Sequence, residues 1–83
     1  KRKINPWHLE QLQKAIHENE AAIRQCQQRL DDIHELLSDN KTYQDQELVI
    51  KLNQEQIALE TKIDKHKAEI SQLEDQYLEL AYD

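Results

Sequence analysis

The stretch Ser38-Asp39-Asn40-Lys41-Thr42-Tyr43-Gln44-Asp45-Gln46 separates two glycine-free runs in which apolar residues recur alternately three and four positions apart. The first series extends from Leu9 to Leu37 and the second from Val49 to Leu80. This spacing places apolar side chains in a narrow stripe along a helix, which is typical of a coiled coil. Continued through the stretch, the first series would fall on four polar residues, Asn40, Gln44, Glu47 and Lys51. One unbroken helix therefore could not present both stripes to one partner, and we predict that the chain folds back on itself here.

The predicted fold class is all-α, with two long helices forming an antiparallel coiled-coil hairpin. Asn5 before Pro6 is a favourable helix start, because Asn caps free backbone N–H groups and Pro suits the first helical position. We expect one hairpin domain over 6–83, preceded by the end of a basic linker over 1–5. Within it we expect a helix over about 6–38, a connection over about 39–45 and a second helix over about 46–81.

The connection leaves two choices for the start of the second helix. Thr42 and Asp45 are both suitable N-cap residues. Tyr43 is the one large apolar residue of the connection, and we expect it to fold down over the open end of the seam between the helices.

The composition agrees with a hairpin rather than a globular domain. The chain has 83 residues, of which 34% are charged and 37% hydrophobic, and its formal net charge is −6. So few apolar residues cannot fill a globular core, but they are sufficient for a seam between helices. We expect a monomeric hairpin. The alternative is a parallel dimer of one long helix, because the connection lacks the Gly or Pro that marks most turns.

Two registers of the hairpin are possible if each a position faces a d position of the other helix. The first sets Leu37 opposite Leu52, Leu30 opposite Leu59 and Leu9 opposite Leu80. The second sets Leu30 opposite Leu52, Ile23 opposite Leu59 and Leu9 opposite Leu73. Flanking charges do not separate them, since the first gives Glu20–Lys67 but also Arg29–Lys62, and the second gives Arg29–Glu55 but also Glu20–Glu60. The first also covers Tyr77 and Leu80, which slightly favours it.

Asn19, Gln56 and His66 interrupt the apolar stripes. Polar seam residues commonly set register and oligomeric state, and we give them this role; the alternative is a buried switch or ligand site at His66. Cys26 lies on the seam and is expected to act as a small buried hydrophobe. No Gly-rich phosphate loop or pair of histidines at metal-ligand spacing is present. We expect no catalysis, cofactor or metal in this chain.

Basic residues occur in two clusters despite the acidic balance. Lys1, Arg2 and Lys3 form the first, while Lys62, Lys65 and Lys67 form the second around His66. These six residues are the candidates for nucleic-acid binding, with a solvated helix face as the plain alternative for the second cluster. Folding back would bring the first cluster close to the acidic end of the chain, where it would be partly neutralised.

Several large apolar residues lie off the seam. Trp7 belongs to the first helical turn, whereas Ile50, Ile57 and Leu78 share one heptad position. Ile50 and Ile57 could be covered by the Tyr43 loop, by a second copy or by a parent domain. The chain has no apolar run near the ~20 residues of a membrane span, and its single Cys cannot form an internal disulfide. We therefore expect a cytoplasmic location.

The connection and the end of the chain resemble the C-terminal coiled-coil domain of ABC-F ATPases of the Uup type. The similar residues are Leu37-Ser38-Asp39, then Tyr43 and Asp45, followed by the closing Leu73-Glu74 and Tyr77-Leu78-Glu79-Leu80. Two positions differ, because Gln46 stands where the family often has Pro and Tyr77 where it often has Trp. The resemblance implies a hairpin that follows the second nucleotide-binding domain of a ribosome-associated ATPase, which itself would bind ATP and Mg upstream.

The functional hypothesis is thus a non-catalytic accessory coiled-coil domain of an ABC-F ATPase that contacts nucleic acid or the ribosome in translation. The alternative is a structural oligomerisation or docking coiled coil that has no nucleic-acid role.

Overall fold

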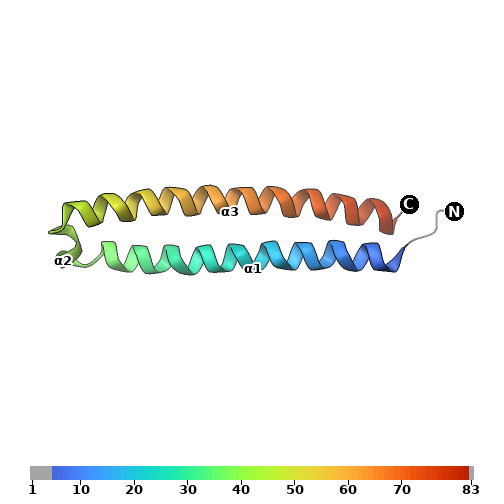
Figure 1. Cartoon of the computed structure of the whole chain (residues 1–83), viewed down its shortest axis with the longest axis horizontal. Coiled ribbons are helices and arrows are strands. Elements are labelled where there is room, and N and C mark those ends of the chain that lie inside the picture. The colour runs from blue at the N-terminus through green and yellow to red at the C-terminus, as the bar shows by residue number, and fades with distance from the viewer. Residues whose placement is uncertain (1–4, 83) are drawn as a thin grey trace.

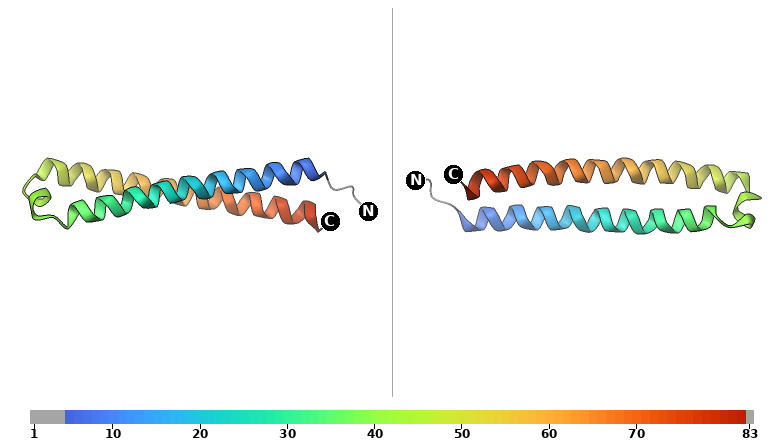
Figure 2. Two further views of the ribbon diagram at one scale, coloured as in Figure 1. Left: turned by 90° about the horizontal axis from the view of Figure 1, so that it is seen from below. Right: turned by 180° about the vertical axis from the view of Figure 1, so that it is seen from behind.

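The computed structural model describes residues 5–82, which form an antiparallel helical hairpin (Figure 1). Its elements in chain order are α1 (Pro6–Leu37), α2 (Asn40–Tyr43) and α3 (Gln46–Ala81). The long helices α1 and α3 pack side by side (Figure 1) and cross at a shallow angle, as the view from below shows (Figure 2). The predicted all-α hairpin is confirmed. By residue rise alone, each long helix extends for roughly 50 Å.

Side chains from outside the helix define the start of α1. The Asn5 side-chain oxygen accepts a hydrogen bond from the Trp7 backbone N–H at 3.0 Å, and Pro6 occupies the first turn. The helix ends at Leu37, and the Ser38 hydroxyl donates to the Glu35 carbonyl at 2.7 Å. This bond uses one of the carbonyls that the last turn leaves without an intrahelical partner.

Two aspartates organise the connection. Asp39 precedes the single turn α2 and accepts from the Lys41 backbone N–H at 3.0 Å. Asp45 precedes α3 and accepts from the Leu48 backbone N–H at 3.1 Å. Asp45, and not Thr42, is therefore the N-cap of the second long helix.

Tyr43 does not close the seam, so that prediction was wrong. Its side chain is 59% exposed, whereas Thr42 beside it is buried at 6%. Neighbouring residues of a helical turn point about 100° apart, so α2 can direct only one of them inward. The small Thr42 occupies the inner position and Tyr43 faces solvent.

The core of the hairpin is a narrow seam. On α1 the buried residues recur at every seventh position: Leu12, Asn19, Cys26 and Ile33. On α3 the buried residues are Leu52 and Ile63. Ile33 is fully enclosed and Cys26 is a buried free thiol, as expected for a small seam residue. Most of the remaining residues are exposed, which is normal for two helices that share one seam.

The register lies between the two that were expected. In the first, Asn19 would face Ile70, and in the second Ile63, but it contacts His66 at 2.7 Å. The Arg29–Glu55 ion pair of the second register is present. Neither expected register accounts for both contacts, because Asn19 and His66 occupy the same class of seam position on their helices. The assumption that a positions face d positions was therefore wrong here.

Among residues 5–82, no helix combines the length and the apolar character that crossing a membrane requires.

Candidate functional site

The polar pair at the middle of the seam is satisfied within the hairpin. The Asn19 Nδ2 amide donates to the Ala15 backbone carbonyl at 2.9 Å, which orients the side chain so that Oδ1 faces the other helix. His66 Nδ1 lies 2.7 Å from that oxygen and therefore carries the proton of this hydrogen bond. In the described part of the chain, no buried side-chain polar atom lacks a partner. The pair is thus hydrogen-bonded across the seam in this register, which is consistent with the register role that the sequence predicts.

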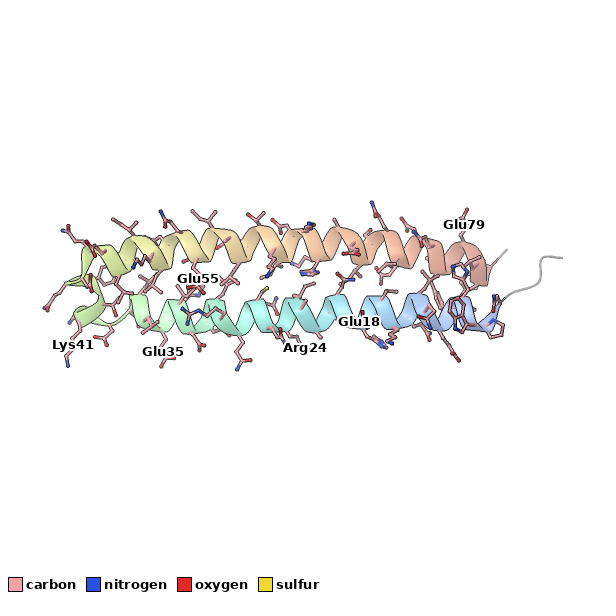
Figure 3. All side chains as sticks on the ribbon, in the orientation of Figure 1. Glu18, Arg24, Glu35, Lys41, Glu55 and Glu79 are labelled. Carbon is pink, nitrogen blue, oxygen red and sulfur yellow. The ribbon has the colours of Figure 1, made fainter. Side chains whose placement is uncertain are left out.

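An ion pair lies beside the seam on one side of the hairpin. Arg29 Nε and Nη2 donate to the two carboxylate oxygens of Glu55 at 2.6 and 2.9 Å. Figure 3 shows Glu55 between the two long helices, while Glu35 and Glu79 project outward from opposite sides of the hairpin. We call the side of the hairpin on which Arg29 and Glu55 lie the ion-pair face.

The same contact changes the ionisation of both groups. The hydrogen bonds from Arg29 lower the pKa of the Glu55 carboxyl, and they outweigh the partial loss of solvent. The hydrogen bonds to Glu55 likewise raise the pKa of Arg29. Both shifts favour the charged forms of the pair.

The opposite side of the seam carries a shallow groove near the end of the hairpin that lies away from the connection. Its volume is about 470 Å³, and it is lined by Gln13, Ile16, His17, Ser71, Glu74, Asp75, Tyr77 and Leu78. Gln13 Nε2 donates to the Tyr77 hydroxyl across it at 3.2 Å. The walls are apolar and polar, and two carboxylates stand on the α3 side. We call this side the groove face.

The exposed apolar residues of α3 continue the groove face toward the connection. Counting back from Leu78 in steps of seven gives Ser71, Asp64, Ile57 and Ile50. A seven-residue step returns to nearly the same side of a helix in a coiled coil. Ile50, Ile57 and Leu78 are 57%, 65% and 51% exposed. We call these five positions the α3 stripe; its apolar members were predicted, but the groove beside it was not.

The groove could not be found from the sequence because it depends on the register. It forms where Gln13 and His17 of α1 come alongside Glu74 and Leu78 of α3. A shift by half a heptad would bring different residues together. The only sequence feature that singles out this part of α3 is the group of acidic residues in its last turns.

The predicted basic site is divided between the two faces. Lys62, Lys65 and Lys67 are all exposed on α3. Lys62 is one heptad from Glu55 and so lies on the ion-pair face, with Lys65 about 60° from it around the helix. Lys67 is one heptad from Glu74 and lies on the groove face. Lys1, Arg2 and Lys3 lie outside the described residues.

The described part of the chain shows no side-chain cluster suited to a metal ion. Within residues 5–82, no three His, Cys, Asp or Glu side chains are grouped as metal ligands would be. Cys26 is enclosed in the seam, where a thiol packs as a small hydrophobe.

Comparison with known proteins adds no family to this description. No protein-family model, curated protein or solved structure matches the chain.

Proposed function

We propose that this chain is a non-catalytic coiled-coil hairpin that serves as an accessory docking arm. The proposal rests on one observation: the seam residues are buried between the two helices, whereas the apolar residues of the α3 stripe are exposed. Ile33 and Leu52 are enclosed between the helices, and the polar pair Asn19–His66 is mutually satisfied. The seam therefore requires no further chain.

Ile50, Ile57 and Leu78 lie outside that seam, and at least half of each is exposed. Large apolar side chains grouped on one face of a small protein commonly mark a contact surface. The shape supports the same role, because a long narrow hairpin can hold such a surface far from the point at which it is attached. These properties favour docking over chemistry.

The resemblance to ABC-F ATPases extends the proposal to a parent protein. In that reading the hairpin follows nucleotide-binding domains, and ATP and Mg would bind to the parent rather than here. Asp39 and Asp45, which carry much of the resemblance at the connection, each cap a helix. Their presence is therefore also explained by what any hairpin of this shape needs.

Contact with nucleic acid or the ribosome is the second candidate function. One arrangement favours it: Lys51 and Lys65 share a heptad position, and Lys62 lies close to Lys65 around the helix. All three are exposed, so they could contact separate phosphates along the ion-pair face. Because few cations are available, binding would weaken steeply as salt is raised.

Two variants separate these functions. Ile50→Gln with Ile57→Gln should leave the thermal midpoint and the helical circular dichroism unchanged if the α3 stripe serves docking rather than folding. Loss of the fold in that variant would refute the docking proposal.

For nucleic acid, the fluorescence anisotropy of labelled duplex DNA and of a labelled RNA hairpin is measured with the protein at low salt. Lys62→Glu with Lys65→Glu should abolish binding, while Lys14→Glu with Lys41→Glu, which changes the net charge equally, should reduce it less.

A further inference from the structure

Within residues 5–82, the apolar members of the α3 stripe stay exposed. The connection was one candidate cover, but Tyr43 is exposed and Ile50 remains 57% exposed beside it. The stripe is apolar near the connection, at Ile50 and Ile57, and again near the end of α3, at Leu78. Between these ends lie Asp64 and Ser71, and Lys67 flanks them on the same face.

This order of residues is self-complementary when the helix is reversed. A twofold axis that crosses α3 between residues 65 and 66 sets each Asp64 opposite Lys67 of a second copy. The same axis sets Leu78 of the second copy at the level of residue 53, between Ile50 and Ile57. Opposite charges therefore meet near the axis, and apolar side chains interdigitate at both ends. A single axis satisfies both requirements, as an isologous contact demands.

We propose that the groove face binds a second copy of this chain, with the two hairpins antiparallel and their α3 stripes in contact. The proposal rests on the docking role given above and names the partner. Each pair of isoleucines would lie against the apolar side of the groove on the other copy, where Tyr77 and Leu78 are available. The aliphatic part of Glu74, which lines that groove, would pack against Ile57 while its carboxylate stays in water.

The contact is small, because only three large apolar side chains per copy are involved. Interfaces of limited area are weak and transient, so the dimer should form at raised concentration while the hairpin itself stays folded as a monomer. The partner is thus a second folded hairpin. The helices of one copy do not replace those of the other in the seam.

Sedimentation equilibrium of the chain tests the proposal first. The average mass should rise from 10.0 kDa toward that of a dimer as the protein concentration is increased. Ile57→Glu should raise the dissociation constant by about tenfold or more, because it replaces a buried apolar contact with a charge. Ala58→Glu is the matched control: it adds the same charge one residue away, on an exposed position that points toward the ion-pair face. A mass that stays at that of the monomer would overturn the proposal, as would equal effects of the two substitutions.

A charge-swapped mixture tests the register of the dimer. Asp64→Lys alone sets Lys opposite Lys67 in its own dimer, and Lys67→Asp alone sets Asp opposite Asp64, so each variant should self-associate less than the wild type. Mixed in equal amounts, the two variants restore both opposite-charge pairs and should form a heterodimer. Failure of the mixture to associate more than its components would refute this arrangement.

The outcome distinguishes this proposal from the one on which it rests. If the Ile50→Gln, Ile57→Gln variant folds normally while the wild type stays monomeric, the docking role stands and the partner is not a second copy. If that variant unfolds, the residues belong to the fold and the docking role itself fails.

Discussion

His66 and Asn19 meet at the middle of the seam, with Nδ1 of the imidazole 2.7 Å from Oδ1 of the amide. The amide is itself held by the Ala15 carbonyl, so the contact has a defined direction. A polar seam residue is costly to bury unless its partner is also present. The two residues therefore favour the register in which they face each other over those in which each would face Ile.

Replacing one member of this pair should destabilise the hairpin more than replacing both. Asn19→Leu leaves the His66 N–H without its partner and should cost about 1–2 kcal/mol in the free energy of unfolding. Asn19→Leu with His66→Leu should be at least as stable as the wild type, because an apolar pair needs no hydrogen bond. Urea denaturation of the two variants checks this. Equal loss in the single and double variants would contradict the role of the pair.

Ile33 should be the most sensitive apolar position of the seam, because its side chain is fully enclosed. Ile33→Ala should cost about 2–5 kcal/mol, a large part of the stability of so small a protein. Ile57→Ala removes the same atoms from an exposed site and should change stability by no more than about 0.5 kcal/mol. Thermal denaturation followed by circular dichroism compares them, and a similar cost for both would contradict the seam as described.

Asp45 should contribute through its cap rather than through its charge. Asp45→Ala removes the oxygen that accepts from the Leu48 N–H and should cost about 1 kcal/mol. Asp45→Asn retains a capping oxygen without the charge, and its stability should remain close to that of the wild type. Chemical denaturation distinguishes the two, and an equal loss in both would assign the effect to charge.

The Arg29–Glu55 pair predicts a pH dependence on the acid side. The pKa of Glu55 is lowered in the folded state, so its contribution to stability is complete above the ordinary Glu pKa of about 4.3 and is lost as the pH falls through the lower folded-state value. The pKa of Arg29 is raised, and its contribution would be lost only at strongly alkaline pH. Denaturation of the wild type and Glu55→Gln at several pH values should show a difference at neutral pH that vanishes in acid. A difference that persists unchanged in acid would contradict this account.

Much of the hairpin follows from local chemistry. The spacing of apolar residues from Leu9 to Leu37 and from Val49 to Leu80 predicts helix with one apolar stripe in each part, and the phase break between them favours a turn over one long helix. Asn5 is a recognisable cap, and Asp45 was one of two candidates with Thr42, because short polar side chains can reach the first backbone N–H groups. These features involve residues only a few positions apart.

The features that could not be predicted depend on contacts between distant residues. The register was missed because Asn19 and His66 were treated as separate interruptions, and not as partners across the seam. The inward position of Thr42 depends on the turn α2, which was not expected within the connection. Lys62, Lys65 and Lys67 are close in sequence but divided in space, because the turn of the helix places Lys67 on the groove face.

The central claim is that one chain folds back on itself with Asn19 facing His66, and nuclear Overhauser effects in the unmodified protein test it most directly. The account predicts cross-peaks between the Asn19 side-chain amide protons and the His66 ring protons. In an equal mixture of labelled and unlabelled protein, isotope filtering should show that they arise within one molecule. Cross-peaks from Asn19 to Ile63 or Ile70 without any to His66 would contradict the register, and cross-peaks found only between molecules would contradict the hairpin.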